Sequence, residues 1–142
     1  MNITVRGPDG TLSILAAPSN DHIGRIALSS GSFYELDLLT ALRAEGATGV
    51  YLDIGAHYGN HTTFFAKHCP AEAVVAVEPS ADTFKLLRQT IELNKLTQVQ
   101  ALQSAVHPSW RWVRSVEGTW RPPPSDPSRT NTCSTPHITH SH

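Results

Sequence analysis

The chain has 142 residues, enough for one ordinary domain and too few for two. Hydrophobic residues make up 39% and charged residues 16%, a composition typical of a globular core with a polar segment attached. The formal net charge of −1 gives no attraction toward polyanions, so neither nucleic acid nor membrane is expected as a partner.

Residues 1–46 are predicted to form a lead-in of a hairpin and a helix. Two apolar runs, 3–5 and 11–15, flank Gly7-Pro8-Asp9-Gly10, whose glycines and proline favour a reversing turn. Ser32-Phe33-Tyr34-Glu35 has the spacing of a capping box, in which the serine and glutamate side chains satisfy backbone amides at a helix start. The predicted helix runs through Leu36 to Leu42 and ends near Gly46.

Residues 47–119 are predicted to form a partial doubly wound domain with the order βαβαβ. Apolar runs at 49–53, 73–77 and 98–102 indicate three strands, the first of them a buried parallel strand. A strand–helix–strand order implies parallel pairing with right-handed crossovers. The fold class is therefore α/β, and the sheet is half of a doubly wound one.

Two helices are predicted between these strands. Asn60 is expected to cap the first, which Pro70 helps to stop. Ser80 is expected to cap the second, in which Phe84, Leu87 and Ile91 share one face, and this helix should end near Asn94.

Residues 120–142 are predicted to be disordered. The segment is rich in Pro, Ser, Thr and His, and its only branched aliphatic residue is Ile138. Such a composition buries too little apolar area to offset the entropy of ordering it. Trp110, Trp112 and Trp120 are expected to pack partly against the sheet rather than to form a stacking surface for nucleic acid.

The turn after the first predicted strand has the features of a site for an adenosine-containing cofactor. Gly55 allows a tight turn, and Gly59 allows close approach of backbone or ligand to the amides of the helix start. Asp53 is an acceptor at the end of the first strand. Glu78 ends the second strand and suits two ribose hydroxyls, since it follows Gly55 at about the spacing of a ribose-binding acid.

Nicotinamide cofactors bind in the same geometry. The glycine spacing distinguishes a dinucleotide site from a site for another adenosine-containing cofactor. A dinucleotide fingerprint that begins at Gly55 would need glycine at the positions of His57 and Asn60. Their side chains crowd the space of a pyrophosphate, which disfavours an NAD- or FAD-dependent oxidoreductase.

The run Leu52-Asp53-Ile54-Gly55-Ala56-His57-Tyr58-Gly59-Asn60-His61-Thr62 resembles motif I of the FkbM family of class I S-adenosylmethionine-dependent methyltransferases. His57 stands where that family usually has asparagine. Val75-Ala76-Val77-Glu78-Pro79 is similar to the second motif, and Ser104-Ala105-Val106 to the third. The likeness covers residues 20–107 and includes the Tyr34-Glu35 lead-in.

The resemblance implies a Rossmann-like methyltransferase half-sheet that binds S-adenosyl-L-methionine and methylates a hydroxyl of a small molecule, sugar or lipid. Gly55, Ala56, His57 and Gly59 would line the methionine end, and Asp53 would contact its amino group. Glu78 would hold the ribose, with Ser104 and Ala105 near the adenine. No residue is assigned as catalytic.

The family's later K-x-D-x-E-G motif is absent from the sequence, and so are the strands that would build the acceptor pocket. We therefore expect residues 50–54 to form an apolar sheet edge, with self-association and marginal stability. The abrupt polar ending is typical of a truncated or frame-shifted gene product. A non-catalytic remnant that retains cofactor affinity is the alternative to an active enzyme.

Localisation and metal binding complete the expectations. The N-terminus has no signal peptide, no apolar run is long enough to cross a bilayer, and Cys69 and Cys133 form no cysteine motif, so a cytoplasmic protein is expected. His57 and His61 are four residues apart but have no acidic partner nearby in the sequence, and no metal site is expected.

Overall fold

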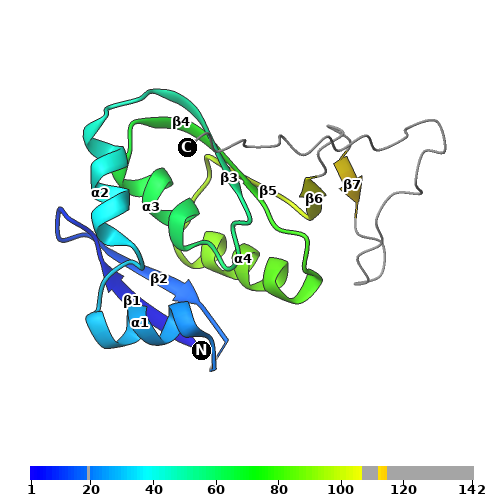
Figure 1. Ribbon diagram of the computed structural model, residues 1–142, viewed down its shortest axis with the longest axis horizontal. Helices are drawn as coiled ribbons and strands as arrows, with labels where there is room; N and C mark the ends of the chain where they lie inside the picture. The colour runs from blue at the N-terminus through cyan, green and yellow to red at the C-terminus, as the bar shows by residue number, and fades with distance from the viewer. Residues whose placement is uncertain (19, 107–111, 115–142) are drawn as a thin grey trace, which may run out of the picture.

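The computed structural model describes residues 1–18, 20–106 and 112–114. Within these residues, eleven elements are arranged as a hairpin, a parallel sheet and a short strand pair, joined by helices (Figure 1). In chain order they are β1 (Asn2–Arg6), β2 (Leu12–Ala16), α1 (His22–Ser30), α2 (Leu36–Ala44), β3 (Gly49–Ile54), α3 (Asn60–His68), β4 (Ala71–Val77), α4 (Ala81–Leu93), β5 (Val99–Leu102), β6 (Ser104–Val106) and β7 (Trp112–Arg114).

The predicted hairpin is confirmed. Strands β1 and β2 pair antiparallel, with Asn2 opposite Ala16, and their inward-facing side chains Ile3, Val5 and Leu15 are fully buried. The hairpin packs against α4, so that α4 lies between the hairpin and the parallel sheet (Figure 1).

The outer edge of β2 is closed by polar side chains of α3 and α4 and of Asn94, which follows α4. Asn94 Oδ1 accepts from the Ile14 amide at 2.9 Å, while Asn94 Nδ2 donates to the Ile14 carbonyl at 2.6 Å. Thr90 Oγ1 accepts from the Ala16 amide at 2.9 Å, and Lys67 Nζ donates to the Leu12 carbonyl. Strand β2 therefore offers these groups to its own helices and not to another chain.

Helix α1 was not among the predicted elements. Asp21 caps it by accepting from the Gly24 amide at 2.7 Å, and Gly31 ends it in the left-handed conformation with φ 65°. Both are ordinary start and stop signals. They enclose apolar residues Ile23, Ile26 and Ala27 at helical spacing.

The helix predicted from Leu36 to Leu42 is present as α2, but the predicted capping box is wrong. Glu35 stands at the N-cap of α2 in the left-handed conformation, with φ 57°, and makes no side-chain cap hydrogen bond. The end is as expected, since Gly46 follows the last turn with φ 65° and donates to the Arg43 carbonyl.

The βαβαβ unit is confirmed as an α/β, Rossmann-like half-sheet. Strands β3, β4 and β5 form a parallel sheet in that order, with Leu52 opposite Val75 and Val75 opposite Gln100. Ser80 caps α4 as predicted by accepting from the Thr83 amide, and α4 ends at Leu93, before Asn94.

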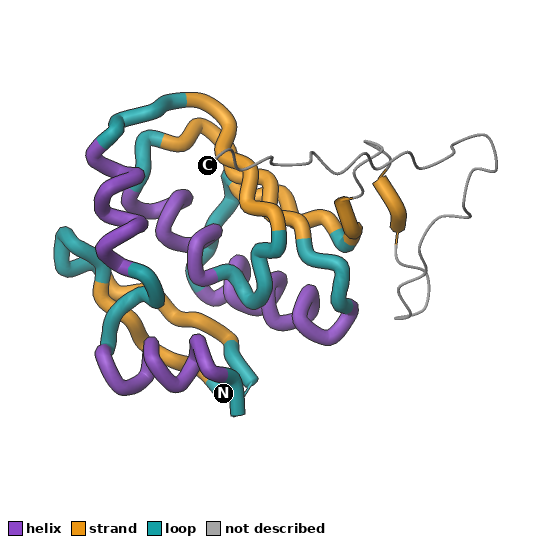
Figure 2. Tube along the Cα trace, in the orientation of Figure 1, coloured by secondary structure: helices purple, strands orange, loops and turns teal. Residues whose placement is uncertain are grey.

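Helices α3 and α4 cover only one face of this sheet (Figure 2). Tyr51 on β3 packs against Phe65 of α3, with ring centroids 5.2 Å apart, and Ala76 on β4 packs against Leu87 of α4. The alternate residues of β3 point to the opposite face and stay exposed: Val50 at 67%, Leu52 at 54% and Ile54 at 57%. The prediction of a buried first strand is therefore wrong for half its side chains. Among the described strands β3 lies at the edge of the sheet and exposes apolar side chains, as predicted.

Strands β6 and β7 pair antiparallel outside the parallel sheet, with Ala105 opposite Val113. The predicted tail 120–142 lies outside the described residues, as do Trp110 and Trp120, so the disorder and the tryptophan packing remain predictions. The proposed boundaries at residues 46 and 119 likewise remain predictions. None of the described helices is both long and apolar enough to cross a membrane.

A buried imidazole joins the hairpin turn to α3. The His68 side chain is fully buried against Phe33 and Phe64, with Nδ1 3.3 Å from Asp9 Oδ2. Burial lowers the pKa of His68, which the Asp9 carboxylate only partly counteracts. The backbone hydrogen bond from Thr11 is the main reason that the pKa of Asp9 falls to about 2.

Acidification is therefore expected to destabilise the fold in two stages. Below a pH of about 6.5 the unfolded chain protonates His68 more readily than the folded chain does, so stability falls as the pH drops. The contribution of Asp9 is present above pH 3.8 and is lost toward pH 2. Urea unfolding at pH 7.5 and 5.5 should show a smaller pH difference for His68→Phe, whereas exposed His22→Gln should keep the wild-type difference.

Candidate functional site

The carboxyl ends of β3, β4 and β5 meet at one edge of the sheet. The amides of Gly55 and Ala56 both donate to the Val77 carbonyl at 2.9 Å. The Glu78 amide donates to the Leu102 carbonyl at 3.1 Å. Open parallel sheets bind ligands at this edge, and all the predicted cofactor residues lie on these strand ends or on the segments that follow them.

The Glu78 carboxylate ties two of these segments together. Its side chain is buried, with the residue only 6% exposed, and Oε2 accepts from the His57 amide at 3.0 Å. Oε1 accepts from the Ser80 amide at 2.9 Å. A carboxylate has about four lone-pair positions, so two backbone donors leave capacity for further hydroxyl donors. Glu78 is thus fixed in position between the two loops and is not a solvated strand end.

Asp53 lies on the helix-covered face of β3 and is 7% exposed. Its Oδ2 accepts a hydrogen bond from Thr62 Oγ1, a fully buried hydroxyl in the first turns of α3. This bond fixes the angle between strand and helix on either side of the turn. Asp53 therefore has a structural role, whatever it contacts in a ligand.

The hydroxyl of Thr62 is expected to matter for stability. Thr62→Val keeps the shape of the side chain but leaves the buried Asp53 carboxylate without this donor, which should cost about 1–3 kcal/mol. The free energy of unfolding in urea measures the loss. Thr40→Val, at an exposed position of helix α2, is the matched control and should change it little. Equal effects of the two variants would mean that the Asp53 hydrogen bond contributes nothing.

The two glycines of the turn have different roles. Gly55 has φ 80°, and a Cβ there would meet no atom within 4 Å, so this side of the turn is open. Gly59 has φ 95°, and its Cβ would lie 2.9 Å from Leu87 Cδ1. The close approach expected at Gly59 is therefore to helix α4 of the chain itself. The contact with α4 is by itself enough to explain a glycine at this position, without a ligand beside it.

His57 occupies the left-handed region with φ 53°. Among non-glycine residues, asparagine, aspartate and histidine adopt this conformation most readily, so a histidine suits this position of the turn. Its Nδ1 is buried without a hydrogen-bond partner among the described residues. The neighbouring Ala56 is 4% exposed, so the turn is a closely packed one.

Tyr58 anchors the turn to the lead-in. Its side chain is fully buried, and burial followed by the nearby Asp21 carboxylate raises its pKa far above the usual value. The phenol is therefore kept neutral, and Asp21 is the N-cap of α1.

Asn60 does not cap α3, contrary to prediction. The N-cap is Gly59, and the Asn60 side chain instead accepts from the Tyr34 amide and donates to the Tyr34 carbonyl, both at 3.0 Å. At the next residue of each segment, His61 Nε2 lies 3.2 Å from Glu35 Oε2. These contacts hold the start of α2 against the start of α3, and no local pattern indicates them because they join residues 26 apart.

Ser104 and Ala105 begin β6, just beyond the end of β5. Ser104 is 8% exposed, and its hydroxyl donates to the Ala105 carbonyl at 3.4 Å. Because the Leu102 carbonyl is bonded to the Glu78 amide, the chain approaches Ser104 next to the Glu78 loop. A hydrogen bond thus connects His57 to Glu78 directly, and Gly55 and Ala56 are bonded to Val77, the residue before Glu78. Ser104 and Ala105 follow the adjoining strand.

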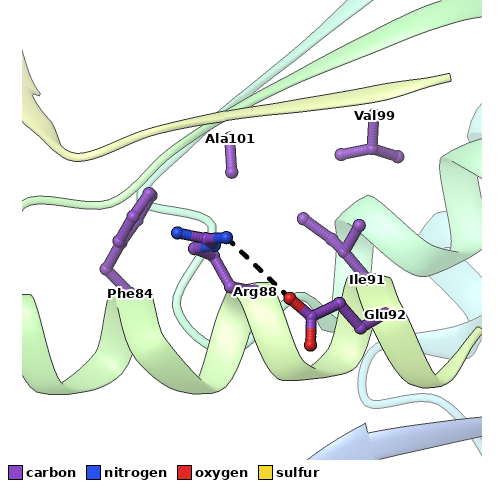
Figure 3. A pocket seen from close by; sticks show the side chains of 6 residues that line it. All are labelled: Phe84, Arg88, Ile91, Glu92, Val99 and Ala101. Carbon is purple, nitrogen blue, oxygen red and sulfur yellow. Dashed lines mark ion pairs between the residues drawn. The ribbon is translucent and has the colours of Figure 1, made fainter. Parts of the chain in front are cut away.

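A cavity of about 260 Å³ lies apart from this edge, between α4 and β5 (Figure 3). Phe84, Ile91, Val99 and Ala101 give it apolar walls, and Arg88 and Glu92 form a 3.9 Å ion pair at its rim. None of the predicted site residues lines it.

Comparisons with known proteins give few matches. No protein-family model matches the chain, and no curated protein matches it, so the FkbM resemblance stays a prediction. Among solved structures the chain is similar to wild-type Trm5b from Pyrococcus abyssi, with 23% identity and a TM-score of 0.49 over 70% of this chain and 27% of that one. It is also similar to TYW2 of M. jannaschii in complex with AdoMet, with 20% identity and a TM-score of 0.47 over 70% of this chain and 42% of that one. The chain thus spans less than half of either protein.

Proposed function

We propose that the chain binds S-adenosyl-L-methionine at the carboxyl edge of its parallel sheet, as the cofactor-binding half of a methyltransferase. The observation that carries this proposal is the buried Glu78 carboxylate, which two backbone amides hold in place beside the Gly55 turn. A fixed acceptor at the end of the second strand is what a ribose diol requires. The open Cβ side of Gly55 provides room next to it.

The residues present fit such a cofactor. Glu78 would accept from the ribose hydroxyls with its remaining lone pairs. Gly55, Ala56 and His57 would line the methionine end, with Asp53 near the amino group. Ser104 and Ala105 would border the adenine. Gly59 would support this site from behind by packing the turn on α4.

We further propose that the activity is of the FkbM type, with a hydroxyl of a small molecule, sugar or lipid as the methyl acceptor. A bound sulfonium supplies an electrophilic methyl group, so the protein would contribute mainly by orienting donor and acceptor. The acceptor and the group that removes its proton remain unassigned.

A non-catalytic cofactor-binding protein is the second candidate. The free edge of β3 favours it, because no described strand or helix stands beside Val50, Leu52 and Ile54 to form a wall for an acceptor. An oxidoreductase is less favoured, since His57 and Asn60 occupy the positions where a dinucleotide fingerprint has glycine.

Calorimetric titration with S-adenosylhomocysteine and, separately, with NADH tests the proposal. Binding of the first ligand alone supports it, and binding of NADH alone replaces it with the oxidoreductase. If neither ligand binds to folded protein, the site is not a cofactor site. Transfer of labelled methyl from S-adenosylmethionine to a panel of hydroxyl acceptors then separates an enzyme from a binding protein.

A further inference from the structure

Strand β3 has one unpaired edge, and the hydrogen bonds of the turn show which groups lie on it. In a strand the N–H and C=O of one residue point to the same side, and those of the next residue to the opposite side. The Gly55 amide donates to Val77 on β4, and Tyr51 and Asp53 share its orientation. The N–H and C=O groups of Val50, Leu52 and Ile54 therefore point away from β4.

Nothing in the described part of the chain pairs with this edge, in contrast to the outer edge of β2. There Asn94, Thr90 and Lys67 bind the backbone groups. Residues 50–54 contain no proline and no lysine, the residues that commonly protect an exposed edge.

The side chains of β3 are self-complementary in an antiparallel register. Reading outward from Leu52, the flanking residues are Tyr51 and Asp53, then Val50 and Ile54. The exposed side chains are thus apolar at the centre and at both ends. Asp53, the only charged residue of the strand, faces the helices and is hydrogen-bonded to Thr62.

We propose that a second copy of this chain pairs with β3 antiparallel, about a two-fold axis at Leu52. Leu52 then lies opposite its own equivalent, and Val50 lies opposite Ile54 of the second copy. Every outward N–H and C=O of residues 50, 52 and 54 finds a partner in this register. The two sheets join into one continuous sheet, and the exposed apolar side chains of both strands lie side by side, which adds cross-strand apolar contact.

The register also places the second copy beside the candidate site. Because Ile54 lies opposite Val50 of the second copy, the segment that precedes β3 in that copy runs past the Gly55 turn. Each copy would therefore border the other's turn with residues 47–49. This inference rests on the strand geometry and does not depend on which cofactor binds.

Disulfide trapping tests the register. Residues opposite each other across a hydrogen-bonded antiparallel pair have Cα atoms about 5.5 Å apart, which a disulfide spans. In a Cys69→Ser, Cys133→Ser background, Leu52→Cys should form a covalent dimer in a glutathione redox buffer. Val50→Cys alone should not, whereas a mixture of Val50→Cys and Ile54→Cys chains should form mixed dimers. Cross-linking of Val50→Cys with itself, or none at Leu52→Cys, would overturn the register.

Sedimentation of the full-length chain tests the association itself. The wild type should sediment as a dimer at micromolar concentration, and Leu52→Lys as a monomer with an unchanged circular dichroism spectrum. Leu28→Lys replaces a similarly exposed leucine on α1 and should remain dimeric. A monomeric wild type, or dissociation by both lysine variants alike, would refute the proposal.

Discussion

Gly59→Ala should lose about 2–4 kcal/mol of folding stability, because two separate costs add at this position. The backbone is left-handed, with φ 95° and ψ 28°, which is strained for any residue with a Cβ. The new methyl would also lie 2.9 Å from Leu87 Cδ1 and 3.3 Å from Thr90 Cγ2. Leu87 is fully buried and has little room to move away.

Gly10→Ala separates the two costs. Gly10 also has a positive φ, 84°, but a Cβ there would meet nothing within 4 Å. It should therefore show the backbone cost alone, about 1–2 kcal/mol. Urea unfolding of both variants gives the difference, which is the packing cost against α4. If the two variants lose equal stability, the contact between the turn and α4 is not close in solution.

Glu78→Ala should weaken the binding of S-adenosylhomocysteine by about 100-fold, which corresponds to two charge-assisted hydrogen bonds at the weaker end of their range. The variant removes the acceptor proposed for the ribose and also releases the His57 and Ser80 amides. Part of the loss would come from a looser turn. Calorimetry gives the affinity, and thermal melting reports the change in stability.

Two further variants define the role of Glu78. Glu78→Gln keeps one carbonyl acceptor but turns an N–H donor toward a backbone amide. Its affinity for S-adenosylhomocysteine should therefore lie between those of Glu78→Ala and the wild type. Glu72→Ala changes an exposed carboxylate at the other end of β4 and should bind as the wild type does. Full affinity of Glu78→Ala would remove the ribose assignment, even if the chain still binds the ligand through other residues.

The elements with strong local signals were predictable from the sequence. The continuous β-branched run of β4 and the Ser80 cap of α4 place those elements nearly where the structure has them. Helix α1 was missed although Asp21 and Gly31 mark both its ends, because Gly24 and its short length weaken the helical pattern. The capping box failed because Glu35 takes a left-handed conformation and faces His61, a partner that is remote in sequence.

Within the candidate site, too, the arrangement of the strand ends was predictable, whereas contacts between separate elements were not. That Asp53, Gly55 and Glu78 would gather at one edge follows from parallel topology, which the strand–helix–strand order already implies. The partners of those residues did not follow from it. Thr62 under Asp53, the amides on Glu78 and the Tyr34–Asn60 pair depend on how separate elements pack.

The side chains that close β2 have a consequence for the order in which a growing chain can fold. Ile14 leaves the ribosome early, but both of its hydrogen bonds go to Asn94, which is 80 residues later. Until the end of α4 has been synthesised, the outer edge of β2 lacks these partners, and the hairpin can pack only on α1 and the segments that follow it. Contacts across such sequence distances form late and slow folding. We expect the first strands of the chain to be the last to reach their final packing. Nascent chains that end before Asn94 should therefore expose the hairpin to chaperones and proteases.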